Sequence, residues 1–236
     1  RGRYKGSVLG FLWTFINPLL QLVVYTIVFS FILKTNIERY YLYLFVALIP
    51  WIFFSSSITV GSASIVAQKD LIKKIYFPRM VIPISYVTSS FVNMLLCFIV
   101  IFAVIIVSGA GINFLALLTL PVIMLVEYIL ALGMAMLTSA ITVYFRDLEH
   151  ILGIVTMAWM YMTPIMYDKS IVPENLMPIF NLNPMTHVIE CYRAVLYEKK
   201  IPDLTTLLSA AGLGILILIV GILVFNKLQK RFAEEL

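Results

Sequence analysis

Apolar residues fill six long runs of this chain, and polar residues are confined mostly to the segments between them. The runs cover Phe11–Leu33, Tyr41–Val66, Val81–Val107, Phe114–Phe145, Ile151–Met166 and Leu204–Phe225. A helix needs about 20 mainly apolar residues to cross a bilayer, and most of the runs reach that length. We therefore predict an all-α membrane protein with six transmembrane helices.

Two of the runs depart from the usual length of a span. The fourth is longer than one crossing requires, and Pro121 near its start is expected to break or kink it. The fifth is short and is expected to extend back through Arg146–His150. We nevertheless assign one crossing to each.

The segment between the fifth and sixth spans is too apolar for an ordinary loop. Val172–Phe180 and Met185–Leu196 are apolar, yet each is too short to span. Backbone at membrane depth must be buried in protein or line a cavity, so we predict two short re-entrant helices. Asn183 and Pro184 between them are a typical helix start, with Asn as the cap and Pro in the first turn.

Composition supports the membrane assignment. The chain is 62% hydrophobic and 12% charged, with a mean hydropathy of +1.01. About a quarter of the residues in a soluble domain are charged, so these charges are too few to cover a water-facing surface. We expect one transmembrane domain over residues 1–236, with further sequence before Arg1, membrane lipids as surroundings and no nucleic-acid partner.

Lysine and arginine are distributed unevenly between the two sides that six spans would create. Six crossings put both termini on one side, together with the connections after the second and fourth spans. That side holds 11 of the 17 basic residues, namely Arg1, Arg3, Lys5, Lys69, Lys73, Lys74, Arg79, Arg146, Lys227, Lys230 and Arg231. Loops rich in Lys and Arg stay in the cytoplasm, so both termini are expected to be cytoplasmic.

Two polar segments on that side are candidates for contact with a partner. As a short helix, the segment Gln68–Arg79 places its apolar residues on one side and its lysines on another, and Pro78 ends the helix. The apolar residues are Leu71, Ile72 and Ile75, and the lysines are Lys69, Lys73 and Lys74. Such a helix either docks in a groove of a cytoplasmic protein or lies on anionic lipid. Arg146-Asp147 is either part of the same contact or a simple interfacial turn.

Aromatic residues crowd the second span, and one acid lies inside the fourth. Tyr43, Trp51 and Phe54 are candidates for a path that carries sugars, because aromatic rings stack on sugar faces; helix packing is the alternative. Glu127 is expected to face the protein interior, as a neutral hydrogen-bonded group or as a coupling-ion site. No second intramembrane acid or base accompanies it.

Catalytic motifs are absent from the sequence. It has no G-x-x-x-x-G-K-[ST] loop for ATP phosphates, no H-E-x-x-H and no C-x-x-C. His150 and His187 are isolated, and Cys97 and Cys191 are unrelated thiols rather than a disulfide framework. A conduit is therefore favoured over an enzyme.

These segments, in this order, resemble the permeases of the type-two ABC exporter superfamily. The branch most similar exports O-antigen polysaccharide, teichoic acid and other polyol-phosphate polymers. The resemblance covers nearly the whole chain and rests on Arg3–Gly10 with Trp13, Asn17-Pro18, Pro50–Ser55, Lys73–Arg79, Phe145–Asp147, Thr163–Ile165 with Tyr167, Asn183-Pro184 and Tyr192-Arg193. Glu127 is not part of the family pattern.

The resemblance implies the partners and the location of the chain. It implies a homodimer of permeases in the bacterial cytoplasmic membrane, working with two copies of a separate ABC ATPase subunit. That subunit would hold ATP and magnesium, so this chain is expected to bind no cofactor or metal and to be no enzyme. The substrate would be a lipid-linked polysaccharide.

The resemblance also implies roles for individual residues. Coupling to the ATPase is expected of Gln68, Lys69, Asp70, Leu71, Ile72, Lys73, Lys74, Arg146 and Asp147. A glycan conduit at the dimer interface is expected to use Tyr43, Trp51 and Phe54. The outer gate is expected to use Asn183, Pro184, Glu190, Tyr192 and Arg193.

Alternatives remain for the gate and for the overall function. Glu190 and Arg193 lie three residues apart on one helical face, so they are expected to pair and hold a closed gate. A static plug or interfacial anchor is the other interpretation. A proton-coupled carrier of lipid-linked sugars is the alternative function, whereas a membrane glycosyltransferase or acyltransferase would need an active-site signature that the chain lacks.

Overall fold

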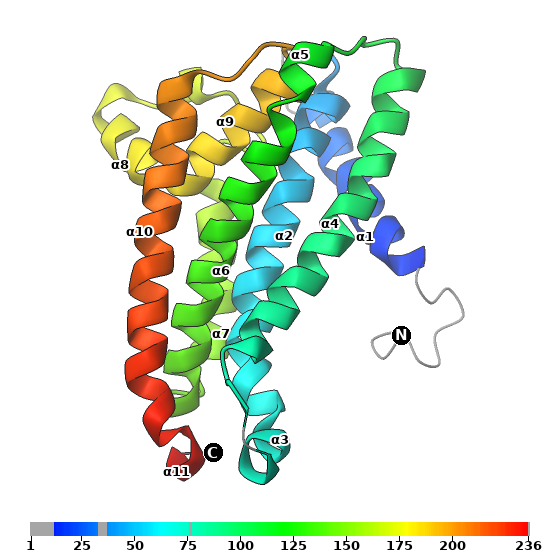
Figure 1. The fold of residues 1–236 in the computed structure, drawn as a ribbon. Coiled ribbons are helices and arrows are strands. Elements are labelled where there is room, and N and C mark those ends of the chain that lie inside the picture. The colour runs from blue at the N-terminus through cyan, green and yellow to red at the C-terminus, as the bar shows by residue number, and fades with distance from the viewer. Residues whose placement is uncertain (1–11, 33–36, 76, 236) are drawn as a thin grey trace.

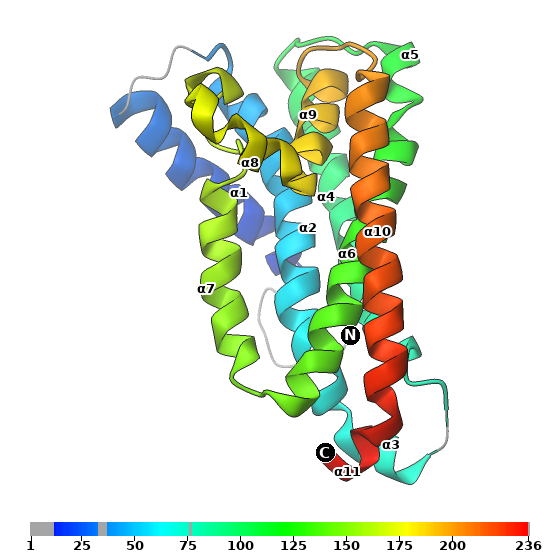
Figure 2. The ribbon, with the colours of Figure 1, turned by 90° about the vertical axis from the view of Figure 1, so that its left-hand side faces the viewer.

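The computed structural model describes residues 12–32, 37–75 and 77–235 of the chain. Over those ranges it is helical and contains no strand. Figures 1 and 2 show long helices standing side by side, with short helices gathered at both ends.

The described part of the chain contains eleven α-helices. They are α1 (Trp13–Thr26), α2 (Tyr40–Ala67), α3 (Lys69–Lys74), α4 (Val81–Val107), α5 (Phe114–Leu117), α6 (Leu120–Tyr144), α7 (Leu148–Tyr161), α8 (Met177–Leu182), α9 (Pro184–Leu196), α10 (Leu204–Leu228) and α11 (Phe232–Glu235). A π-helical turn, Ile27–Ile32, continues α1 directly. Three short 3-10 turns cover Lys169–Ile171, Glu174–Leu176 and Gln229–Arg231.

Four stretches are long and apolar enough to cross a membrane. They are α2, α4, the combined stretch Phe114–Tyr144, and α10 with its extension to Arg231. The predicted first and fifth spans are also helical but shorter: an apolar stretch over Phe15–Phe29, and the 14 residues of α7. The prediction of an all-α membrane protein is confirmed to this extent: the described residues are helical, and four stretches could cross a membrane.

Two of the expected irregularities are present. The fourth run is broken between α5 and α6, and Pro121 lies in the first turn of α6, where its missing N–H costs no helical hydrogen bond. α7 begins at Leu148, so it takes in part of Arg146–His150 as expected. It ends at Tyr161, earlier than predicted, because the chain turns at Thr163 and Pro164.

The short helices are sorted by end. α3, α11 and the α6–α7 turn lie at one end of the bundle, and α5, α8 and α9 lie at the other, in both views (Figures 1 and 2). The basic segments after α2, after α6 and after α10 therefore share one end, as the charge distribution requires. Arg1, Arg3 and Lys5 lie outside the described residues.

α6 and α10 cross with their backbones in contact. A Cβ atom built on Gly221 would lie 2.3 Å from the carbonyl oxygen of Gly133, and one on Gly133 would lie 2.6 Å from the backbone nitrogen of Leu218. Neither position can accept a side chain unless the helices separate. Small residues at crossings are a common basis of helix association in lipid, where no hydrophobic force drives helices together.

We expect Gly221→Leu to destabilise the fold by more than about 3 kcal/mol, because the backbone of α6 would have to move away. Gly212→Leu, on the same helix, is the matched control, since a Cβ there meets nothing within 4 Å. The control should change stability by less than about 1 kcal/mol. Unfolding in mixed micelles of rising SDS content measures both, and equal losses would contradict a role for the close crossing.

Candidate functional site

The elbow between α8 and α9 is fixed to the end of α7 by Asn183. Its Oδ1 caps α9 by accepting a hydrogen bond from the Met185 amide at 3.0 Å, and it also accepts one from Trp159 Nε1 at 2.9 Å. Its Nδ2 donates to Thr163 Oγ1 at 2.9 Å. The helix start expected at Asn183-Pro184 is confirmed, and the same amide ties that start to α7.

Arg193 fastens α9 to the turn that follows α7. Its side chain is buried, and its two terminal nitrogens donate to the carbonyl oxygens of Pro164 at 2.5 Å and Ile165 at 2.6 Å. The guanidinium also lies 3.6 Å from the ring centroid of Tyr43. A planar fork of donors suits two neighbouring carbonyls and an aromatic face at once.

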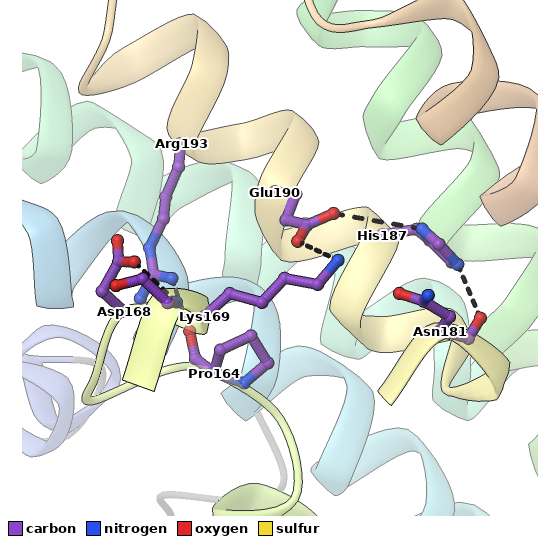
Figure 3. A network of polar contacts seen from close by, with 8 residues as sticks. Pro164, Asp168, Lys169, Asn181, His187, Glu190 and Arg193 are labelled. Atoms are coloured by element: carbon purple, nitrogen blue, oxygen red, sulfur yellow. Dashed lines mark hydrogen bonds and ion pairs between the residues drawn. The ribbon is translucent and has the colours of Figure 1, made fainter. Parts of the chain in front are cut away.

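The expected pairing of Glu190 with Arg193 is wrong. Glu190 Oε1 instead lies 2.8 Å from Lys169 Nζ, and its Oε2 lies 4.0 Å from His187 Nδ1 (Figure 3). The spacing of three residues did not decide the outcome, because buried carbonyls outside the helix hold the guanidinium. Figure 3 shows the two side chains leaving α9 in different directions.

Asp168 is part of the same turn. Ser170 donates from its amide to Asp168 Oδ1 at 2.9 Å. Hydrogen bonds from the Ser170 side chain and amide hold the pKa of the Asp168 carboxyl below its usual range. The carboxylate therefore stays ionised near the buried Arg193 and partly balances its charge.

Tyr192 and Glu127 join α9 to α6. The Tyr192 hydroxyl donates to Glu127 Oε2 at 2.6 Å, and both side chains are fully buried. Glu127 Oε1 has no hydrogen-bond partner among the described residues. The arrangement favours a hydrogen-bonded structural glutamate, and it brings an expected gate residue into contact with the intramembrane acid.

The three expected conduit residues lie inside the single chain. Tyr43 and Trp51 are each 4% exposed, and Phe54 is 0% exposed. The Tyr43 hydroxyl donates to the Tyr167 carbonyl, while the Phe54 ring meets Trp159 edge-on at 5.2 Å. Within one chain these rings fill the space between α2 and its neighbours, so their geometry favours helix packing over an open lining.

α3 and Ile75, the residue that follows it, carry one apolar side chain that points into the chain and two that point outward. Ile72 is 6% exposed and packs in a small core with Phe225 and Phe232, whereas Leu71 is 39% and Ile75 56% exposed. Of the residues expected to contact the ATPase, Ile72 therefore anchors α3 to its own chain and is not available to a partner. Gln68 joins α2 to α3 and is half-buried, while Lys69, Asp70, Lys73 and Lys74 are exposed.

The turn between α6 and α7 presents Arg146 and Asp147 to the outside. Both side chains are exposed, and they do not form an ion pair with each other. They share an end of the bundle with α3 (Figure 2). The structure thus leaves both residues available to a partner.

The described residues contain no group of three or more His, Cys, Asp or Glu side chains placed to hold a metal ion. Cys97 and Cys191 are both buried, on different helices, and neither forms a disulfide. The polar groups that do gather are those around α9. The sequence did not indicate that Lys169, His187 and Trp159 belong to this group. Only the three-residue spacing of His187 and Glu190 on one helix could have indicated that His187 does.

Comparison with known proteins places this arrangement in a family. The profile of the ABC-2 type transporter family matches residues 1–197. The chain belongs to the ABC-2 type transporter family. The family resemblance carried by the motifs is thereby confirmed, and the apolar helices are those of a multi-pass membrane protein.

Three relatives match this ABC-2 type chain over almost its full length. The O-antigen export system permease protein RfbA of Myxococcus xanthus is 33% identical over 238 residues, which cover 100% of this chain and 91% of that protein. Two proteins of the same name from Klebsiella pneumoniae are 35% and 34% identical, with 99% of this chain and 90% of each relative covered.

We expect Arg193→Lys to loosen the turn after α7, because an ammonium group cannot serve both carbonyls and stack on Tyr43. The free energy that holds this turn in its closed position should fall by about 2 kcal/mol. Maleimide labelling of Met166→Cys, in a chain with Cys97 and Cys191 replaced by Ala, measures it, since Met166 is 3% exposed. Labelling should rise severalfold in Arg193→Lys.

The matched control is Glu190→Gln in the same background. It removes the carboxylate that the sequence paired with Arg193 but leaves both carbonyl contacts in place. Labelling at position 166 should stay at the starting rate. A rise in the control without a rise in Arg193→Lys would contradict the contacts described.

Proposed function

We propose that this chain is the membrane subunit of an ATP-driven exporter that moves lipid-linked polysaccharide across the bacterial cytoplasmic membrane. O-antigen, teichoic acid or a similar glycan would be the polymer. The observation that carries the proposal is identity of 33–35% over at least 99% of the chain with proteins named O-antigen export permeases. Family membership supports the coupling to an ABC ATPase.

The proposed assembly contains two copies of this chain and two ATPase subunits, which would bind ATP and magnesium. α3 would dock on the ATPase through Leu71 and Ile75, with the exposed lysines around them. A short amphipathic helix in a groove is a common docking mode. The excess of Lys and Arg at this end supports its cytoplasmic location, with both termini there.

The proposed membrane arrangement keeps six crossings. α1 with Ile27–Ile32 would form the first, and α7 the fifth. α8 and α9 would lie re-entrant on the extracytoplasmic side, since both are too short to span and connect to α7 and α10 at the same end of the bundle. The bonds made by Asn183 and Arg193 support this, because they satisfy non-helical backbone inside the protein.

The proposed conduit lies between two copies of the chain. Tyr43, Trp51 and Phe54 are buried in one copy, so they would support the wall of the conduit from behind. α7 offers an outward apolar face, on which Ile154 is 67% and Tyr161 59% exposed. An aromatic ring at that exposed position suits contact with a sugar face better than the buried rings do.

A proton-coupled carrier is the second candidate. It would use Glu127, the one acid within the described spanning stretches Tyr40–Ala67, Val81–Val107, Phe114–Tyr144 and Leu204–Arg231. A proton path through the membrane typically uses several titratable groups in series. Glu127 instead accepts a hydrogen bond from Tyr192, which supports a structural role.

The function is tested by depleting the chain in its native host and analysing glycans inside the cell. We expect lipid-linked polysaccharide to accumulate in the cytoplasm, and the wild-type gene to restore export. The purified chain alone should hydrolyse no ATP, because ATP binding is assigned to the partner. Export that persists when ATP is exhausted but a proton gradient remains would favour the carrier instead.

The same assay tests α3. Complementation with Leu71→Ser and Ile75→Ser together should lower export at least tenfold, because the docking face loses its apolar area. Val107→Ser is the control, since Val107 is 89% exposed at the opposite end of α4. Export at the wild-type level by the double variant would favour the lipid-surface interpretation of α3.

The proposed outer gate is divided into a fixed part and a movable part. Ten of the 13 residues of α9 are buried, and its contacts through Tyr192 and Arg193 hold it to α6 and to the turn after α7. α8 has no buried residue. We therefore assign the movement to α8 and its 3-10 turn, with α9 as the fixed support and Pro184 at the joint.

Cross-linking between two copies tests the movement. Leu182→Cys, 71% exposed on α8, should react with a cleavable bismaleimide in a background lacking Cys97 and Cys191, and the cross-link should block export until it is cleaved. Met185→Cys is the control, because Met185 is 0% exposed and should form no cross-link. Undiminished export through a confirmed cross-link would support the static plug.

A further inference from the structure

A wide-open cavity of about 700 Å³ lies on the surface between α8, α9 and α10, away from the contacts that fix α9. Its charged and polar lining residues are Lys169, Asn181, His187, Glu190, Thr205, Thr206 and Ser209. Its apolar lining residues are Leu182, Leu213 and Leu216, next to Gly212. The proposed function does not explain a cavity lined by charged residues at one end and leucines at the other.

In the proposed membrane arrangement, the cavity runs from the membrane surface into the hydrocarbon. α10 begins at Leu204, so Thr205 would stand at its surface end, and Leu216 lies 11 residues further along the helix. At about 1.5 Å per residue, the lining extends about 16 Å along the helix, roughly half the thickness of the hydrocarbon core. Gly212 lies between the polar and apolar parts, and a Cβ there would meet nothing within 4 Å.

The charged cluster at the surface end offers both signs. Lys169 Nζ pairs with Glu190 Oε1 at 2.8 Å, and their side chains are 30% and 26% exposed (Figure 3). A lysine carries three donors and a carboxylate about four acceptor sites, so one contact leaves capacity on each.

His187 lies beside this pair, with one ring nitrogen bonded to the backbone and the other buried. Its Nε2 lies 2.8 Å from the Asn181 carbonyl oxygen, which only accepts, so this nitrogen donates. Its Nδ1 is buried, has no hydrogen-bond partner among the described residues and lies 4.0 Å from Glu190 Oε2. His187 therefore supports the position of Glu190, and the capacity for a ligand lies with Lys169 and Glu190, which are both partly exposed.

We propose that this cavity binds a phospholipid whose headgroup carries both a phosphate and a primary amine. The phosphate accepts hydrogen bonds from Lys169, and the ammonium group donates to Glu190. One acyl chain lies along Gly212, Leu213 and Leu216. This ligand matches the two charges and the change from polar to apolar lining residues along α10. The inference does not depend on which polymer is exported.

A photo-reactive residue on α10 tests the site. The full chain is placed in nanodiscs that contain equal amounts of phosphatidylethanolamine, phosphatidylcholine and phosphatidylglycerol, with benzoylphenylalanine at position 212. Position 208 is the matched control: Leu208 is 60% exposed, lies one helical turn away and does not line the cavity. Mass spectrometry identifies the cross-linked lipids.

Position 212 should capture phosphatidylethanolamine at least fivefold over each of the other lipids, whereas position 208 should report the bulk mixture. Glu190→Gln should bring the ratio at position 212 close to one, because the ammonium loses its acceptor. Lys169→Gln should lower the total capture there relative to position 208.

Three outcomes would overturn the proposal. The first is the same lipid composition at positions 212 and 208. The second is a preference at position 212 that survives both Glu190→Gln and Lys169→Gln. The third is capture of a polyprenyl phosphate in place of phosphatidylethanolamine when both are supplied, which would assign the cavity to the transported lipid.

Discussion

The half of this protein that contains α8 and α9 depends on how Arg193 satisfies two backbone carbonyls. The turn after α7 has left the helix, so the Pro164 and Ile165 oxygens have no helical donor. In the proposed membrane arrangement, hydrocarbon would provide no substitute, and an unsatisfied polar group there costs several kcal/mol. One guanidinium serves both oxygens and stacks on Tyr43, so α2, α7 and α9 meet around a single side chain.

A second layer of contacts makes that meeting point rigid. Asn183 caps α9 and holds the end of α7, and Tyr192 donates to Glu127 on α6. At the other end, Ile72 joins α3 to the core that contains Phe225 and Phe232. α3 therefore packs against the end of α10, which is also the helix in backbone contact with α6.

The sequence was informative wherever local chemistry decides the outcome. Runs of apolar residues located the helices, Pro121 marked the break before α6, and Asn183-Pro184 marked the start of α9. It was uninformative about which direction a side chain takes once helices pack. Glu190 and Arg193 have suitable spacing yet diverge, and Tyr43, Trp51 and Phe54 have suitable chemistry yet lie inside the chain, because tertiary neighbours decide both.

The shortness of α7 has a consequence for the surrounding bilayer. Its 14 residues rise about 21 Å, against about 30 Å for a hydrocarbon core. In the proposed arrangement the membrane beside α7 must thin, at a fraction of a kcal/mol for each ångström of mismatch. If two copies face each other along α7, the thinned regions of membrane beside the two α7 helices would coincide. A polar headgroup crossing there would then meet a barrier lowered by the deformation of the lipid itself.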